Sequence, residues 1–195
     1  SPRFDFLPTF YEFLKEENQM QLRWLLGEEK DDIRFRLSKV LLNDIIRARY
    51  DVVLIDTPPR PTTGMVNALC ASSYFLVPTV LDNSSAEAVR YFLQVVQNNF
   101  KQLNPALDLL GIVGTMTQQQ NKLSEWEQKA KQRIHDEMIW VPRREVFDRH
   151  IPHKAAISKA AGQDFVFNTD EEVKGWFEKL GGEIEEQIYG TRSEP

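Results

Sequence analysis

The stretch Tyr50-Asp51-Val52-Val53-Leu54-Ile55-Asp56-Thr57-Pro58-Pro59 decides the fold class that this sequence predicts. Four apolar residues follow one another in it without polar alternation, and three of them are branched at Cβ. Such a run predicts a strand that is buried on both faces. Strands of this kind are typical of parallel sheets with helices on both sides, so the stretch favours an α/β fold.

The rest of the chain alternates predicted strands with predicted helices. This order predicts a three-layer α/β domain over 1–195, with a mostly parallel sheet and helices on both faces. Its last part, 166–195, is expected to form an acidic amphipathic helix that packs on the domain. The predicted strands are 4–8, 52–56, 74–78, 109–115 and 146–147, and the predicted helices are 11–26, 31–49, 63–72, 84–100, 122–138, 154–161 and 170–189.

The composition excludes several classes of protein. Of the 195 residues, 42% are apolar and 27% are charged, a balance that excludes a disordered tail, a collagen and a disulfide mini-protein. No apolar run approaches the roughly 18–20 residues that span a bilayer, and no membrane association is expected. The single cysteine, Cys70, is expected to be a buried thiol rather than a nucleophile, in a cytoplasmic setting. A net charge of −5 gives no global attraction to nucleic acid or acidic lipid.

Asp56 is the first candidate for chemistry because it ends the predicted buried strand at 52–56. Open parallel sheets bind ligands at the carboxyl ends of their strands, and an Asp there can hold Mg²⁺ through water beside phosphates. The alternative is that Asp56 only caps the next turn. Pro58 and Pro59 fix the backbone path that follows, which suits a loop that senses a ligand.

Together with later segments, the stretch resembles the ParA/MinD-type (Soj-like) partition ATPases, which carry a deviant Walker A loop. The Asp-Thr-Pro-Pro block in this order and spacing is its most specific part, and the resemblance covers roughly residues 45–165. The further matching segments are Asn67-Ala68-Leu69, Phe75-Leu76-Val77-Pro78, Gly111-Ile112-Val113-Gly114-Thr115, and Phe147 to Pro152 with the helix at 155–161.

The resemblance implies a P-loop NTPase-like fold and roles for particular residues. Asp56 matches the Walker B Asp, near Mg²⁺ and the attacking water, and is the one catalytic candidate. The residues Thr57, Pro58 and Pro59 match the switch loop that responds to the γ-phosphate, and Thr115 and Pro152 fall beside the adenine. For the intact parent protein the resemblance implies ATP and Mg²⁺ as cofactors, a homodimer, non-specific DNA binding and a partner protein that stimulates the ATPase.

The phosphate-binding loop of that family is not found in this sequence. No glycine is followed by the Lys-Ser/Thr pair that ends a P-loop, since Gly27 precedes Glu28 and Gly181-Gly182 precede Glu183. The amides that cradle phosphates and the lysine that neutralises them are therefore not found. We expect the chain to be the C-terminal part of such an ATPase, without its first strand and P-loop. We further expect that the chain alone does not hydrolyse ATP.

Charge is unevenly distributed along the second half of the chain. Residues 129–154 carry seven basic and four acidic side chains and all three histidines, whereas 164–195 carry nine acidic and three basic ones. The basic stretch, 129–154, could contact DNA phosphates, or it could simply be a solvated surface. The candidate DNA contacts are Lys131, Arg133, Arg143, Arg144, Arg149 and Lys154.

Three functions therefore remain open from the sequence. The leading one is a portion of a ParA-like ATPase that partitions DNA, a plasmid, a chromosome or another cargo. The second is a non-catalytic, ATPase-like module that binds a partner protein. The third is a non-specific DNA-binding domain that uses the basic stretch. A sheet without its first strand exposes edges, so the chain is also expected to dimerise or aggregate.

Overall fold

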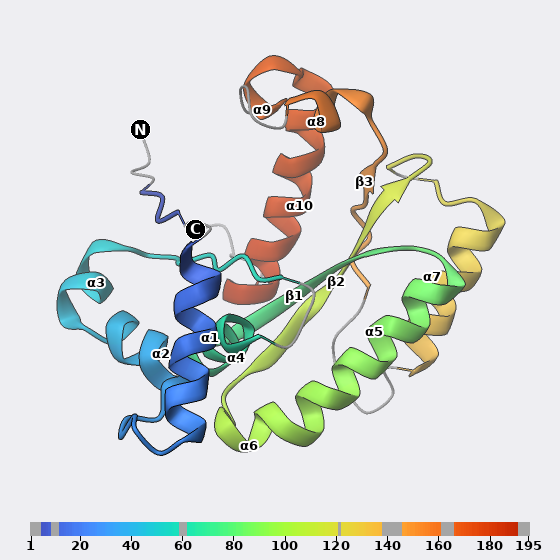
Figure 1. Cartoon of the computed structure of the whole chain (residues 1–195). Coiled ribbons are helices and arrows are strands. Elements are labelled where there is room, and N and C mark those ends of the chain that lie inside the picture. The colour runs from blue at the N-terminus through green and yellow to red at the C-terminus, as the bar shows by residue number, and fades with distance from the viewer. Residues whose placement is uncertain are drawn as a thin grey trace. The chain divides into compact units, whose positions relative to one another are not determined.

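The computed structural model in Figure 1 forms two compact units, and each is described here by itself. The first unit consists of residues 1–73 and 102–107, and the second of 74–101 and 108–195. The residues that the structure describes are 5–8, 12–58, 62–120, 122–137, 146–160 and 166–190. Among the helices of these residues, none combines the length and the apolar composition that crossing a membrane requires.

The first unit is helical, and side-chain caps mark where its helices begin. Asp32 accepts a hydrogen bond from Arg34 N, and Asn43 accepts one from Ile45 N. The helix predicted over 31–49 is therefore divided into three, because Asn43 begins a new helix in the middle of the pattern. The elements are α1 Glu12–Leu25, the 3₁₀ helix η1 Ile33–Phe35, α2 Arg36–Leu41, α3 Asp44–Arg49 and α4 Thr63–Ala71.

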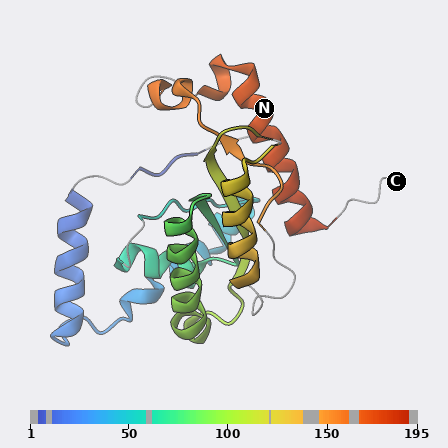
Figure 2. The ribbon, with the colours of Figure 1, turned by 90° about the vertical axis from the view of Figure 1, so that its right-hand side faces the viewer.

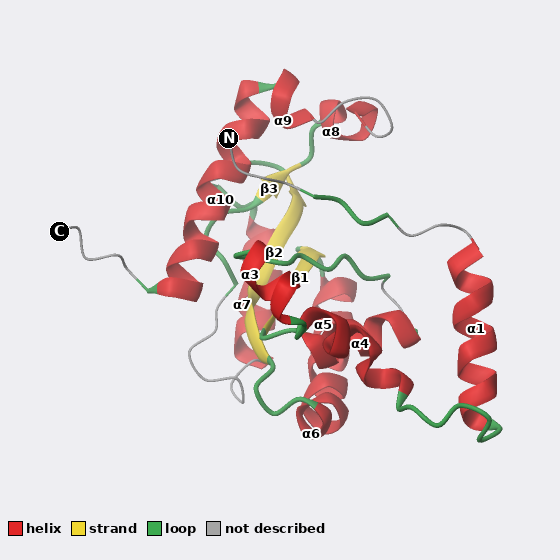
Figure 3. Ribbon diagram, turned by 90° about the vertical axis from the view of Figure 1, so that its left-hand side faces the viewer, coloured by secondary structure: helices red, strands yellow, loops and turns green. Residues whose placement is uncertain are grey.

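The strand predicted at 52–56 does not form, and this prediction is wrong. Residues 52–58 are irregular, and Val52, Val53 and Leu54 are 57%, 48% and 89% exposed. The residues Asp5–Pro8, where another short strand was expected, are also irregular. Figure 3 draws strands only at β1, β2 and β3, all in the second unit. A β-branched run favours extended backbone, but a strand also needs a neighbour to pair with, and none of the described strands pairs with this run.

The second unit contains a parallel three-stranded sheet in the order β1-β2-β3. β1 is Tyr74–Val80, β2 is Asp108–Thr117 and β3 is Ile151–Pro152, so the predicted strands at 74–78 and 109–115 are confirmed. In the register, Phe75 pairs with Leu109 but Leu76 pairs with Gly111. This bulge leaves one extra residue in β2, and as a result Leu109 and Ile112 contribute to the same core cluster.

Helices cover both faces of this sheet, as the sequence predicted. On one face α5 and α7 pack side by side, and on the other lies α10 (Figures 1 and 2). The first core cluster includes Leu93, Ile112 and Ile134, and the second includes Val113 and Val173. A T-shaped contact of the Phe75 and Phe92 rings, with centroids 6.1 Å apart, adds to the packing of α5 on β1.

Caps again determine the ends of the helices in the second unit. The N-cap of α5 is Asp82, which accepts from Ser85 N, so the helix begins one residue before its predicted start at 84. Val146, expected in a short strand, makes only an isolated bridge to Ile112. The helices are α5 Asn83–Val95, the π-helical η2 Val96–Phe100, α7 Glu125–Glu137, α8 Ala155–Ala160, α9 Val166–Thr169 and α10 Glu171–Tyr189. A short helix, α6 Lys101–Leu103, begins in the second unit and ends in the first.

Candidate functional site

The segment that carries the predicted switch loop lies in the first unit, just before α4. Asp56, Thr57 and Pro58 are exposed, and Pro59 lies outside the described residues. Across the described ranges, no cluster of three or more His, Cys, Asp and Glu side chains could hold a metal ion. A single carboxylate such as Asp56 suits Mg²⁺ only when water and the phosphates of a nucleotide supply the other ligands, which is how ATPases commonly hold it.

A buried acid from α1 fixes the start of the helix that follows this segment. The side chain of Thr62 accepts from Met65 N and caps α4. The Glu17 carboxylate accepts from Gly64 N at 2.5 Å, and only 6% of Glu17 is exposed. A carboxylate at a helix N-terminus also interacts favourably with the helix dipole. Helix α1 is thereby joined to the first turn of α4, which follows Pro58 closely in the sequence.

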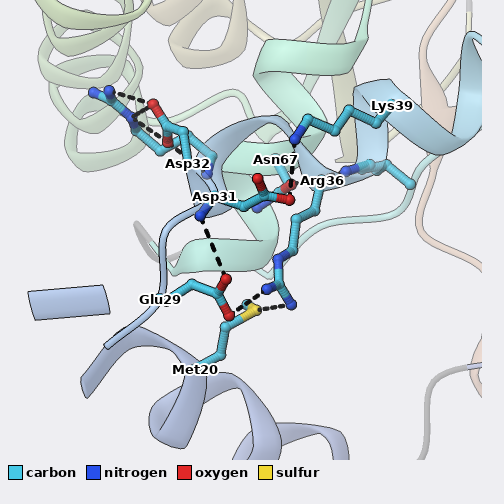
Figure 4. Close-up of polar contacts among 9 residues, drawn as sticks. Met20, Glu29, Asp31, Asp32, Arg36, Lys39 and Asn67 are labelled. Atoms are coloured by element: carbon cyan, nitrogen blue, oxygen red, sulfur yellow. Dashed lines mark hydrogen bonds and ion pairs between the residues drawn. The ribbon is translucent and has the colours of Figure 1, made fainter. Parts of the chain in front are cut away.

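Asn67, in the Asn-Ala-Leu run, joins α4 to the preceding helices. Its Nδ2 donates to Ile33 O at 2.7 Å and to Thr63 O at 2.9 Å, and its Oδ1 accepts from Leu37 N at 3.0 Å. The residue is only 7% exposed. Figure 4 shows Asn67 beside the segment that carries Asp31, Asp32 and Arg36. Its polar atoms thus connect α4 to η1 and α2, which explains why an amide side chain occupies position 67.

Ion pairs join charged side chains along residues 29–39 (Figure 4). Arg36 lies 2.6 Å from Glu29, and Lys39 lies 3.2 Å from Asp31. The Arg34 guanidinium donates to Asp32 and holds the pKa of that carboxyl below its usual range. These pairs are partly exposed, so each contributes about 0–1 kcal/mol at most, and they stabilise this segment rather than form a ligand site.

The two residues expected beside the adenine lie on neighbouring strands of the second unit. Thr115 pairs with Ile151 in the register, and Thr117 pairs with Pro152, so both lie near the carboxyl end of β2. The Thr115 hydroxyl donates to Thr79 O at 3.1 Å, which joins it to β1. Pro152 is buried. The structure therefore brings Thr115 and Pro152 together, and Asp56, Thr57 and Pro58 belong to the other unit.

A polar groove lies between α7 and the segment that leads into β3. It has a volume of about 490 Å³, and its lining includes Lys122, Gln128, Lys131, Asp148, Arg149 and His150. His150 is only 3% exposed and its Nδ1 has no hydrogen-bond partner. Burial, reinforced by the nearby Lys131 cation, lowers the pKa of His150 to about 4, so the ring is neutral at pH 7.

Glu127 supports the same region from inside, with only 1% of the residue exposed. Its carboxylate accepts from Ser124 N and Ser124 Oγ, both at 2.7 Å, and from Gln118 N at 3.0 Å. Burial alone would raise the pKa of Glu127, but these hydrogen bonds lower it overall.

Sequence reasoning missed Glu127 and His150 as buried polar residues. A signal for Glu127 was present, because Ser124 and Glu127 have the spacing of a capping box at the start of α7. His150 carries no comparable signal, since its burial depends on residues far away in the sequence, such as Gly114 of β2 and Lys131 of α7.

The basic candidates differ in their surroundings. The Lys131 amine donates to Asp148 at 2.9 Å, and that contact lowers the pKa of Asp148. Lys154 contacts two carboxylates, Asp170 at 2.8 Å and Glu172 at 2.6 Å. Arg133 and Arg149 are exposed. Arg143 and Arg144 lie outside the described residues.

The family profile described as "AAA domain" (AAA_31) matches residues 3–109, which is more than half of the chain. The chain belongs to the AAA_31 family. The match includes the Asp-Thr-Pro-Pro stretch and α4, and it ends inside β2. The resemblance drawn from this stretch is thus confirmed at the level of the family.

Curated proteins that are similar to the chain include partition proteins. The chain is 34% identical over 131 residues to the chromosome partitioning protein ParA of Caulobacter vibrioides, covering 65% of this chain and 45% of ParA. It is 27% identical over 159 residues to the chromosome-partitioning ATPase Soj of Treponema pallidum, covering 80% of this chain and 59% of Soj. The chain thus spans about half the length of these relatives.

Solved structures of McdA from Cyanothece share the fold. The apo structure has a TM-score of 0.67 at 17% identity, and covers 86% of this chain and 64% of McdA. The ATP complex of a McdA variant has a TM-score of 0.65 at 17% identity, and covers 92% of this chain and 65% of McdA. These likenesses confirm an α/β fold with a parallel sheet of the kind that McdA has.

Proposed function

We propose that this chain is a portion of a ParA-like partition ATPase, and that the intact protein moves or positions DNA or another cargo. One observation carries the proposal: the Asp-Thr-Pro-Pro block, Asp56 to Pro59, lies in a segment that matches the AAA_31 family. In the intact protein, Asp56 would hold Mg²⁺ through water, and Thr57, Pro58 and Pro59 would respond to the γ-phosphate of ATP. Thr115 and Pro152 would flank the adenine.

The proposal does not assign ATP hydrolysis to the chain by itself. Asp56 is an exposed carboxylate, and the sequence offers no Gly-Lys-Ser/Thr loop to hold the phosphates next to it. We therefore expect no steady turnover of MgATP by the purified chain. Phosphate release is measured for the chain and for Asp56→Ala, with Asp51→Ala as the matched control. Turnover that Asp56→Ala abolishes and Asp51→Ala preserves would contradict this expectation.

Non-specific binding of DNA is the second part of the proposal. The basic stretch 129–154 carries Lys131, Arg133, Arg149 and Lys154 in the second unit, and Lys131 and Arg149 line the polar groove. Contacts to phosphates release counterions, so binding weakens steeply as salt increases.

The test is fluorescence anisotropy of a labelled random-sequence duplex at increasing KCl. Charge reversal by Arg143→Glu with Arg144→Glu should reduce binding, whereas the control pair Lys15→Glu with Arg47→Glu, in the first unit, should reduce it less. Equal effects of the two pairs would show that only overall charge matters.

A protein-interaction module is the alternative that a specific observation favours. Leu22, Leu25 and Leu26, at and just beyond the end of α1, are 57%, 70% and 64% exposed. Contiguous exposed apolar side chains commonly mark protein contacts. Binding of a partner protein with an affinity that does not change with salt, together with no DNA binding, would favour this function.

A further inference from the structure

Lys154, one of the proposed DNA contacts, is held by the acidic first turn of α10. Its Nζ lies 2.8 Å from the Asp170 carboxylate and 2.6 Å from Glu172 Oε2. The same amine lies 5.5 Å from the centroid of the Trp176 ring. The chain passes from Lys154 through α8 and α9, and these helices lie beside the start of α10 (Figures 1 and 2).

The two carboxylates that hold Lys154 have different structural duties. Asp170 is the N-cap of α10, and its Oδ1 accepts from Glu172 N and Val173 N. Removing it would therefore damage the helix as well as the ion pair. Glu172 has no such role in the contacts described, and 64% of its side chain is exposed. Glu172 is therefore the carboxylate whose removal isolates the charge effect.

Acidic groups cover other anion-binding groups of the basic stretch in the same way. The Glu183 carboxylate of α10 accepts from Asp148 N at 2.9 Å and from Arg149 N at 3.0 Å. The Lys131 amine donates to Asp148. Two lysines and two adjacent amides, all of which could bind phosphate oxygens, thus already have carboxylate partners within the chain.

We propose that the acidic face of α10 competes with nucleic-acid phosphates for the basic stretch, with Glu172 masking Lys154. The inference rests on the proposed DNA contact of residues 129–154. The Lys154 ammonium has three N–H donors, and Asp170 and Glu172 already accept from it, so a phosphate that approaches this amine must compete with two negative charges. Exposed ion pairs are weak, so the contact of Glu172 with Lys154 lowers the affinity for DNA only modestly. A change of charge at Glu172 is enough to remove this effect.

The test compares Glu172→Gln with Glu178→Gln, an exposed position on the same helix that changes the net charge equally. Anisotropy titrations with the labelled duplex at low salt give the affinities. Glu172→Gln should bind about two- to fivefold more tightly than Glu178→Gln, the range that an exposed ion pair allows. Thermal unfolding checks that both variants are folded.

A variant of Lys154 decides whether the gain acts through this lysine. In the Lys154→Gln background, Glu172→Gln should give no further gain, because the masked group has been removed. If the wild-type chain binds DNA but Glu172→Gln binds no more tightly than Glu178→Gln, the masking is wrong and the proposed DNA contact stands. A gain that persists without Lys154 leads to the same conclusion. If neither the wild type nor Glu172→Gln binds DNA, the masking and the proposed DNA contact both fail.

Discussion

At the scale of single residues, Asn67 joins three backbone segments by its one side chain. Replacing it with Ala leaves Leu37 N without its side-chain acceptor and Ile33 O without its side-chain donor. Each buried polar group left unsatisfied costs about 1–3 kcal/mol, so Asn67→Ala should lower the free energy of unfolding by about 2–4 kcal/mol. Urea denaturation measures this, with Asn18→Ala on the exposed surface of α1 as the control. A loss below about 1 kcal/mol would show that water or the backbone replaces the amide.

His150 makes stability depend on pH. Its pKa is about 4 in the folded chain and near 6.5 when exposed, so the unfolded state binds the proton more readily. Stability from this residue is therefore complete above about pH 6.5 and is lost as pH falls toward 4, by up to about 3 kcal/mol.

We expect His150→Gln to flatten that part of the pH profile, with the midpoint of urea unfolding measured at several pH values. His135→Gln and His153→Gln, at exposed positions, should keep the wild-type slope. A wild-type slope in His150→Gln would assign the pH dependence to other groups.

At the scale of elements, the glycines of β2 allow close packing against the segment that follows α7. A Cβ on Gly114 would lie 2.8 Å from His150 Nδ1 and 2.9 Å from Leu81 Cδ1. Gly114→Ala should therefore lower the free energy of unfolding by about 1–3 kcal/mol. In contrast, a Cβ on Gly181 meets nothing within 4 Å. Gly181→Ala, in the middle of α10, should raise it by about 0.5–1 kcal/mol, because alanine loses less backbone entropy in a helix.

Both glycine variants are compared by chemical denaturation. If Gly114→Ala is as stable as the wild type, the His150 ring has moved aside. The pH dependence of the unfolding midpoint should then also differ from that of the wild type. No gain for Gly181→Ala would indicate that α10 does not unfold together with the sheet.

At the scale of the whole molecule, apolar surface and an unpaired strand edge favour association. In the described sheet β1 pairs only with β2, so its other edge is unpaired. The irregular run Val52–Leu54 also exposes apolar side chains. Such edges and runs invite pairing with another chain. Sedimentation velocity of the purified chain should show species larger than a monomer as concentration increases.

Leu54→Lys should shift that association toward monomer, because it places a charge in the exposed apolar run. Ala48→Lys, an exposed position on α3 that gains the same charge, is the control. A clean monomer of the wild type at high concentration would contradict this prediction.

The sequence by itself determined the α/β class, most helices, the two main strands of the sheet and a family resemblance that the AAA_31 match supports. These follow from local apolar patterns, caps and the Asp-Thr-Pro-Pro block, because each of these signals lies within one short segment of the sequence. Only the tertiary structure decided that 52–56 is unpaired, that His150 is buried, and that Lys154 lies against α10. Strand pairing, burial and ion pairs join residues far apart in the chain, and a local pattern contains no information about such partners.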